Sequence, residues 1–496
     1  MAMINVLSLV LAAVAFRTPE VIPPVAELTC RTNVEVRLDA TQRVTVRCGD
    51  ARAADWVRMH AKQWFGFEPR ISVASPERSL TNGCYRLTAD SDGLVIEAGE
   101  LSGVRNAMFT LRQIVERDSC GYTVQRYRMP EFEILDRPAL SFRGLHLCWF
   151  PEQSERELER QIRMAAAYKF NYVVLESWGV FCSEQHPWFG WKDGPMTKEA
   201  VGRLVRVAED LGVTLIPQIN VFGHASASRS CVGKHAALDC GPEYQPLFEP
   251  AGGLNGSMSS AWNWCLSNPE AVRTVRELVV EMHEAFGSPP FFHIGCDEAD
   301  EPTCASCRSA QYDDLVCTHI SGICELLRQR GARALMWHDM LLEKGDARWK
   351  GFYANGSETT ARLVGRLPKD VVVCDWYYGD AVKSGAYPTL EYFSKTCGFD
   401  TLSCSWNDKS GIRAQSAYAR DHGLYGTMGT VWHHFGGTRF PALVQATACG
   451  AWGRGEYLSD GHFATVWRQC GWDSGAASYK DAGWNATQSS RDILGR

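Results

Sequence analysis

The chain has 496 residues, of which 45% are hydrophobic and 22% are charged, and its formal net charge is -6. This composition excludes a largely disordered chain and supplies enough apolar residues for one large domain and a smaller one. Lysine and arginine form no basic stripe, so neither nucleic acid nor an anionic membrane surface is an expected partner. We expect a neutral or polar small substrate.

The first segment, residues 1–16, is strongly apolar. With roughly a dozen apolar residues it is too short to span a bilayer. It is typical of a signal-peptide core, with Ala13-Val14-Ala15 as the small-residue cleavage site. We therefore expect a secreted or periplasmic protein without stable membrane insertion. Because no basic residue precedes the apolar run, a cytoplasmic location stays open, and the 19 cysteines do not decide it.

Residues 26–138 have a pattern of their own. Short strand-like runs surround a helical segment near residues 103–116, and Asn82-Gly83 is typical of a hairpin turn. This pattern predicts a small α+β domain.

Residues 139–455 repeat one unit, in which an amphipathic helical stretch alternates with a short apolar run rich in branched residues. Ser154 and Asn268 are expected to cap two of the helices. The repetition predicts a (β/α)8 TIM barrel, whose functional residues belong at the carboxyl ends of the strands. Residues 456–496 are assigned to a terminal helix and tail. The expected strands are Gly144–Trp149, Asn171–Glu176, Val213–Ile219, Phe291–Cys296, Ala332–His338, Val371–Trp376, Phe399–Ser405 and Leu424–Trp432.

Two adjacent acids, Asp297 and Glu298, follow the fourth of these runs. Neighbouring residues on a strand point to opposite sides, so the two carboxylates can occupy different environments and one can stay ionised while the other keeps a proton. A solvated strand end or a helix cap is the alternative for a bare acidic pair. The apolar strand before the pair favours catalysis, and the long interval from about residue 220 to 268 predicts a binding loop beside it.

The segment His293-Ile294-Gly295-Cys296-Asp297-Glu298 resembles the His-x-Gly-x-Asp-Glu signature of glycoside hydrolase family 20, the β-N-acetylhexosaminidases. The resemblance covers nearly the whole chain. The Cys-x-x-Cys at 304–307, and Leu175-Glu176 followed by His186-Pro187, are most similar to the hexosaminidase D-like branch. Other segments that resemble the family are Tyr85–Val115, Arg143-Gly144-Leu145, Ile216–His224 and Trp264–Pro269.

The resemblance implies a retaining exo-β-N-acetylhexosaminidase that removes terminal N-acetylglucosamine or N-acetylgalactosamine from a glycan or glycoconjugate. In this family the nucleophile is the substrate's own 2-acetamido oxygen, so catalysis is substrate-assisted. Glu298 would protonate the glycosidic oxygen and later activate water. Asp297 would orient the acetamido nitrogen and stabilise the oxazolinium intermediate.

The resemblance also implies contacts to the substrate. Arg143 would bind the sugar's outer hydroxyls, although its place at the start of a strand is equally typical of a structural ion pair. His224 would contact the catalytic acid, and Tyr377 would donate a hydrogen bond to the acetamido oxygen. For each aromatic residue, packing in the core is the alternative. The apolar wall around the sugar would be formed by Trp337, Trp376, Trp406 and Trp432.

Two features depart from the family pattern. Ser177-Trp178-Gly179 stands where the hexosaminidase D-like branch has an aromatic residue and two acids, so an acid is missing at Gly179. Gln218 and Asn220 are neutral where many relatives carry acids. These departures leave open a catalytically impaired member that only binds glycans.

A second alternative is a barrel hydrolase of another reaction type, for example a metal-assisted one. His338-Asp339 and His433-His434 are the residues that hint at it. For Cys304 and Cys307, no second cysteine pair or suitably spaced histidines are found nearby, so a disulfide or a structural thiol pair is expected rather than a metal site. We expect no metal and no cofactor, and the sequence predicts neither the sugar configuration nor the oligomeric state.

Overall fold

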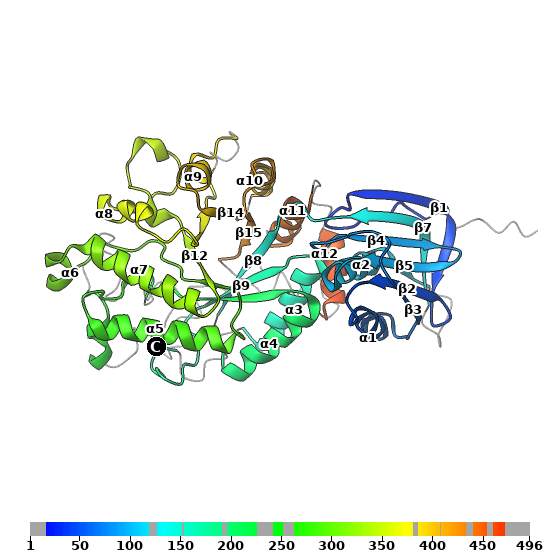
Figure 1. Cartoon of the computed structure of the whole chain (residues 1–496), viewed down its shortest axis with the longest axis horizontal. Coiled ribbons are helices and arrows are strands. Elements are labelled where there is room, and N and C mark those ends of the chain that lie inside the picture. The colour runs from blue at the N-terminus through cyan, green and yellow to red at the C-terminus, as the bar shows by residue number, and fades with distance from the viewer. Residues whose placement is uncertain are drawn as a thin grey trace, which may run out of the picture. The chain divides into compact units, whose positions relative to one another are not determined.

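The computed structural model describes residues 16–118, 126–150, 153–190, 196–225, 242–250, 262–379, 385–406, 408–432, 440–453 and 460–471. The expected signal peptide lies outside these residues except for Phe16, so export stays a prediction, and His433-His434 lies outside them too. In the described part of the chain, no helix has the length and apolar character needed to cross a membrane. The chain divides into two compact units, residues 1–138 and 139–496, which are described separately (Figure 1).

The first unit is built on a mixed sheet with the strand order β1-β7-β4-β5-β2-β3, and β6 pairs with β7. Alternate residues of β4 and β5, such as Leu87 and Ile96, are fully buried, as expected for a sheet with one covered face. The helices α1 and α2 contact this sheet, which confirms the expected α+β fold. The elements are β1 (Glu27–Leu38), β2 (Arg43–Cys48), α1 (Ala53–Phe65), β3 (Arg70–Ala74), β4 (Tyr85–Asp90), β5 (Gly93–Ala98), α2 (Leu101–Ile114), β6 (Glu116–Arg117) and β7 (Tyr127–Asp136).

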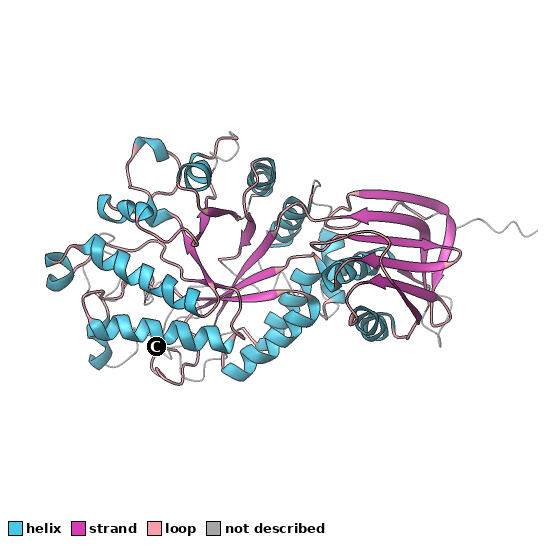
Figure 2. Cartoon of the chain, viewed as in Figure 1, coloured by secondary structure: helices cyan, strands magenta, loops and turns pink. Residues whose placement is uncertain are grey.

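The second unit is a closed barrel of parallel strands in chain order, β8 to β15, surrounded by helices (Figure 2). All eight strands fall within or next to the runs expected from the sequence, and the prediction of a TIM barrel is confirmed. The strands are β8 (Phe142–Trp149), β9 (Tyr172–Ser177), β10 (Thr214–Gln218), β11 (Phe291–His293), β12 (Arg333–Trp337), β13 (Val372–Trp376), β14 (Asp400–Ser405) and β15 (Gly426–Thr430).

Helices follow the strands as the repeat predicted. Ser154 begins α3 with a capping box in which Glu157 returns the hydrogen bond, and the Asn268 side chain caps α5, which has Pro269 in its first turn. The α-helices are α3 (Glu155–Ala167), α4 (Lys198–Leu211), α5 (Pro269–Ala285), α6 (Ala305–Ser309), α7 (Tyr312–Gln329), α8 (Glu358–Ala361), α9 (Pro388–Glu391), α10 (Lys409–Asp421), α11 (Phe440–Trp452) and α12 (Asp460–Gln469). Short 3-10 helices are η2 (Pro242–Leu247), η3 (Asp339–Leu341), η4 (Ala347–Trp349) and η5 (Arg362–Gly365), and η7 (Tyr392–Thr396) is a π-helix.

Side chains of alternate strand residues fill the interior of the barrel. They are Phe142, Val174, Ile216, Phe291, Leu335, Trp337, Val372, Cys374, Leu402, Cys404 and Met428. Because side chains alternate along a strand, the residue two positions further on points to the same side. This rule places Glu176, Gln218 and His293 above the core, at the carboxyl ends of β9, β10 and β11. The barrel therefore ends in a polar layer.

Candidate active site

The acidic pair lies on a turn rather than on a strand. β11 ends at His293, and the backbone of Gly295, Cys296 and Glu298 is left-handed, with φ of 67°, 72° and 47°. A Cβ at Gly295 would lie 1.3 Å from Asn220 Oδ1, so only glycine fits this turn. The prediction that the two acids continue the strand is wrong: the turn, and not strand alternation, separates the carboxylates.

Asp297 and Glu298 nevertheless occupy different environments. The side chain of Asp297 is 7% exposed and that of Glu298 is 48% exposed. His224 Nε2 lies 3.3 Å from Asp297 Oδ2 and 3.2 Å from Glu298 Oε2, while its ring packs 4.1 Å from that of Trp262. His224 is thus placed where the resemblance expects it, in contact with both acids.

Asp339, on η3, holds the turn of the acidic pair through hydrogen bonds. Its buried carboxylate accepts hydrogen bonds from the Glu298 amide (3.0 Å), the Asn355 side chain (2.9 Å) and the Trp376 indole (3.1 Å). Burial, and then the negative charge of Asp297, raises the pKa of Asp339 to about 6. The sequence showed Asp339 only as a hint of metal-assisted chemistry. With three N–H donors on its oxygens, it acts instead as a positioning residue for Glu298 and Trp376.

The tryptophans expected to form an apolar wall do come together. Trp337 lies 5.4 Å from Trp432, and Trp376 and Trp406 lie 5.4 and 5.3 Å from Tyr378, as ring centroid distances. Tyr378 links the two groups because its hydroxyl accepts a hydrogen bond of 2.6 Å from the Trp432 indole. The wall thus runs along the ends of β12 to β15.

Tyr377 is not part of this wall. It lies between Trp376 and Tyr378 in sequence and packs in an apolar cluster with Tyr387 and Leu390. Tyr378 instead contacts the wall, and its hydroxyl accepts hydrogen bonds from the Trp432 indole and the Thr430 hydroxyl. Burial raises the pKa of Tyr378 well above the ordinary value. The structure therefore places Tyr377 in the apolar cluster and Tyr378 against Trp376 and Trp406.

Arg143 lies far from the acidic pair along the strand direction. It is the second residue of β8, between the interior residues Phe142 and Gly144, so its side chain points out of the barrel. Its guanidinium donates to the carbonyl oxygens of Leu140 and Lys169, both at 3.0 Å, and packs over the Trp452 ring. The expected contact of Arg143 with substrate hydroxyls is therefore wrong, and the structural alternative holds, with carbonyl oxygens in place of an ion pair.

Several buried polar atoms of the barrel end make no hydrogen bond within the described residues. They include both imidazole nitrogens of His146, both side-chain polar atoms of Gln218, and Trp337 Nε1. The His146 ring lies 4.6 Å from that of Trp432 and 5.7 Å from that of Trp337. Such groups are costly unless something pairs with them, and the side chains of His146, Gln218 and Trp337 are fully buried. The sequence did not reveal this polar floor at the end of the barrel.

Although an acid is missing at Gly179, a nearby acid, Glu176, is present. Glu176, 1% exposed, accepts a hydrogen bond of 3.0 Å from the Trp178 indole, and its Oε2 lies 3.3 Å from His146 Nε2. A carboxylate therefore remains at the end of β9 despite the departure from the family pattern.

A cleft of about 400 Å³ opens beside Glu298. Residues from η3 and the segments around it line the cleft together with Trp262 and residues 298–301. Glu298 lines it and Asp297 does not. The exposed Glu298 side chain therefore faces the cleft, while the buried Asp297 side chain does not.

The comparison with known proteins agrees with this geometry. The model of the glycosyl hydrolase family 20 catalytic domain matches residues 155–439, and the model of that family's domain 2 matches residues 18–137. The chain belongs to glycoside hydrolase family 20.

Its relatives in the family are distant. A beta-hexosaminidase of Vibrio furnissii is 24% identical over 311 residues, which is 55% of this chain and 47% of the relative. A beta-hexosaminidase of Porphyromonas gingivalis is 25% identical over 350 residues, or 62% of this chain and 43% of the relative. The chain thus spans about half the length of these curated relatives.

Solved structures share the fold over almost the whole chain. The β-N-acetylhexosaminidase of Bacteroides fragilis has a TM-score of 0.65 at 19% identity, with 94% of this chain and 99% of that one covered. The Streptomyces plicatus enzyme in complex with Thio-NAglucal has a TM-score of 0.63 at 17% identity, with 96% and 99% covered. At these identities the likeness establishes the barrel and the preceding domain alone.

Proposed function

We propose that the protein is a retaining exo-β-N-acetylhexosaminidase that hydrolyses terminal N-acetylglucosamine or N-acetylgalactosamine by substrate-assisted catalysis. The observation that carries the proposal is the pair Asp297 and Glu298 at the barrel mouth, one buried and one exposed, with His224 in contact with both. Two carboxylates in different environments can take different catalytic roles.

Glu298 is the proposed general acid and base. Its side chain is 48% exposed and lines the cleft of about 400 Å³, where a leaving group has room. As the bond between the anomeric carbon and the glycosidic oxygen breaks, Glu298 gives its proton to that oxygen. It then takes a proton from the water that attacks the anomeric carbon, which restores the starting state.

Asp297 is the proposed partner of the acetamido group. Its buried carboxylate can accept the acetamido N–H, which turns the acetamido oxygen toward the anomeric carbon. As that oxygen forms its bond to carbon, positive charge develops on the oxazolinium ring beside Asp297. The Tyr378 hydroxyl, which accepts hydrogen bonds from the Trp432 indole and the Thr430 hydroxyl, is the proposed donor to the acetamido oxygen.

The wall and floor of the site fit one sugar ring. Trp376, Trp406 and Trp432 offer flat apolar surface to the ring and the acetamido methyl, and the fully buried Trp337 packs against Trp432. Sugar hydroxyls would pair with the Gln218 amide and with His146 Nδ1, which make no hydrogen bond within the described residues, whereas His146 Nε2 already lies 3.3 Å from Glu176 Oε2. These polar groups would bind the sugar hydroxyls in place of Arg143.

Hydrolysis of aryl N-acetyl-β-glucosaminides and galactosaminides by the purified protein tests the activity. Glu298→Gln should lose about two to four orders of magnitude in kcat/KM with poor leaving groups and less with activated ones, since only poor ones need protonation. Asp297→Ala should lose rate with both classes, because the nucleophile itself is misplaced.

Two results would overturn this assignment. Equal sensitivity to the leaving group in both variants would contradict the division of roles. Binding of N-acetylhexosamine without any turnover would favour the glycan-binding alternative, which the neutral Gln218 and the position of Arg143 support.

A further inference from the structure

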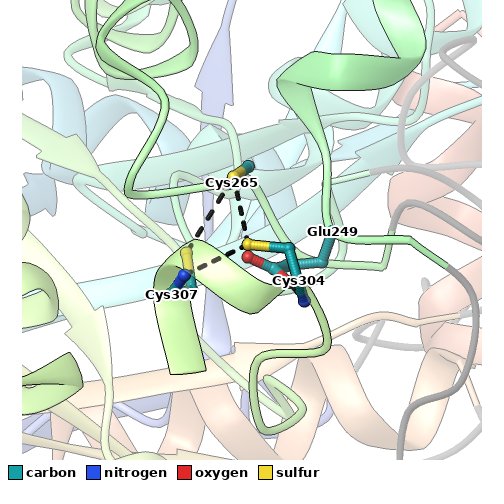
Figure 3. Close-up of side chains that lie close together, drawn as sticks. All are labelled: Glu249, Cys265, Cys304 and Cys307. Atoms are coloured by element: carbon teal, nitrogen blue, oxygen red, sulfur yellow. Dashed lines mark hydrogen bonds between the residues drawn. The ribbon is translucent and has the colours of Figure 1, made fainter. Parts of the chain in front are cut away.

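Four residues outside the acidic pair meet in one cluster, which Figure 3 shows. Glu249 follows η2, and Cys265 precedes α5. Cys304 is the N-cap of the short helix α6, and Cys307 lies within this helix. One ligand atom from each residue lies within 4.8 Å of the others. Within the described residues all three cysteines are free thiols, so the disulfide expected for Cys304 and Cys307 is not formed.

The sulfur positions fit a tetrahedral metal ion. Cys265 Sγ lies 3.8 Å from Cys304 Sγ and 3.9 Å from Cys307 Sγ. Four ligands arranged tetrahedrally with Zn–S bonds of about 2.3 Å place their sulfurs about 3.8 Å apart. A disulfide needs about 2.05 Å, and pairing two of the thiols would leave the third unpaired.

Glu249 offers the fourth ligand. It is 4% exposed, and its Oε1 is buried without a hydrogen-bond partner in the described part of the chain. Its other oxygen is held by the backbone amides of Thr303 and Cys304, at 2.8 and 2.7 Å. One carboxylate oxygen is thus fixed by the chain, and the other is left for a ligand in the cluster. A buried carboxylate oxygen without a partner is costly unless a cation or a donor meets it.

Neighbouring donors suit thiolates rather than thiols. The Cys307 amide donates to Cys304 Sγ at 3.2 Å, within the Cys-x-x-Cys turn. The Cys307 thiol donates to the hydroxyl oxygen of Ser267 at 3.2 Å, and Cys265 Sγ lies 3.4 Å from the same oxygen. Once the thiols are ionised, the Ser267 hydroxyl can donate its proton to one of these sulfurs instead. Hydrogen bonds of this kind from surrounding groups orient the ligands of metal sites and stabilise their negative charge.

We propose that Glu249, Cys265, Cys304 and Cys307 bind one structural zinc ion. All four ligands come from the protein, so the site is closed and leaves no position for substrate. The ion would join three segments that are far apart in sequence: residues 242–250, 262–268 and 301–309.

A zinc ion at this site would also stabilise the active site, because the segment that supplies Cys265 contacts the turn of the acidic pair. The Trp262 indole donates to the Glu298 carbonyl oxygen at 2.8 Å, and Asn263 exchanges hydrogen bonds with the backbone of Asp300 at 2.6 and 3.1 Å. Both residues lie in the same segment as Cys265, three and two positions before it. Loss of zinc should therefore loosen the turn of the acidic pair as well as lower the stability of the fold.

Metal analysis of the full chain, purified under reducing conditions and dialysed against zinc, tests the proposal. We expect about one tightly held zinc per chain, as in other closed structural sites. Cobalt exchanged into the site should give the visible bands of a tetrahedral ion and a thiolate charge-transfer band in the near ultraviolet. Removal of the metal by a chelator should lower Tm by several degrees, about the effect of losing a ligand that binds only the folded state.

Variants separate the site from general thiol chemistry. Cys304→Ser should abolish stoichiometric zinc, and Glu249→Gln, which keeps all three thiols and the size of the side chain, should weaken zinc binding at least tenfold. Cys317→Ser is the matched control, because Cys317 is a buried thiol on α7 outside the cluster. It should keep the full zinc content.

Zinc content well below one per chain in the folded wild type, or equal zinc affinity in Glu249→Gln and the wild type, would refute the proposal. So would a disulfide between any two of the three cysteines after purification under reducing conditions. These readouts do not depend on hydrolytic activity, so they stand apart from a failure of the proposed function.

Discussion

Replacing Asp339 with asparagine tests the network that holds the turn of the acidic pair. The carboxylate accepts three hydrogen bonds, from Glu298, Asn355 and Trp376. Asparagine keeps one acceptor oxygen but presents an NH2 group to the remaining donors. Because losing a hydrogen bond to a charged group costs about 1.5–3 kcal/mol, we expect kcat to fall roughly 10- to 100-fold.

The stability of the wild type relative to this variant should depend on pH in a defined direction. Burial and the charge of Asp297 raise the pKa of Asp339 from 3.8 to about 6. Between about pH 4 and pH 6, the folded protein therefore holds a proton that the unfolded chain has released, and the free energy of unfolding falls as the pH rises. A shift of this size corresponds to roughly 3 kcal/mol lost by neutral pH. Asparagine does not ionise, so the variant escapes this loss.

Urea denaturation of the wild type and Asp339→Asn at about pH 4 and pH 7 measures the effect. The variant should gain on the order of 3 kcal/mol relative to the wild type between the two pH values. Asp92→Asn, at an exposed aspartate of the first unit, is the control and should show no such gain. A stability difference between Asp339→Asn and the wild type that does not change with pH would refute the reasoning.

Two further substitutions test the corrected positions. Tyr378→Phe should lower kcat about tenfold or more by removing the proposed donor to the acetamido oxygen, whereas Tyr377→Phe should leave kcat within about twofold of the wild type. Similar kinetics for the two variants would contradict the assignment. Arg143→Lys should lower the free energy of unfolding by about 1–2 kcal/mol, since it loses a donor to the Leu140 or Lys169 carbonyl oxygen. KM should not change. A raised KM with unchanged stability would show that Arg143 contacts the substrate after all.

The sequence by itself determined the barrel, the small domain before it and the location of the acidic pair. Eight apolar runs alternating with helical stretches are a long-range repetition, and such a pattern survives errors of one or two residues at each strand end. The segment from His293 to Glu298 could be found because its residues are contiguous. The helix caps at Ser154 and Asn268 were equally readable, since they depend on residues within one turn.

Side-chain direction at the ends of the strands was decided by the tertiary structure. A shift of one residue reverses the face on which a side chain lies, and that difference separates Tyr378 from Tyr377 and turns Arg143 out of the barrel. For the acidic pair, the left-handed backbone at Gly295 and Cys296 ends the strand early. A sequence pattern of period two carries no information about such a turn.

Contacts between distant segments also required the fold. Asp339 reaches the Glu298 amide across 41 residues, and Cys265 meets Cys304 across 39. Neither pair forms a motif in the sequence. These contacts depend on where β10, β11 and β12 end in the barrel, and local propensity does not determine that arrangement. The Cys-x-x-Cys therefore looked like an isolated pair until the barrel brought Cys265 and Glu249 beside it.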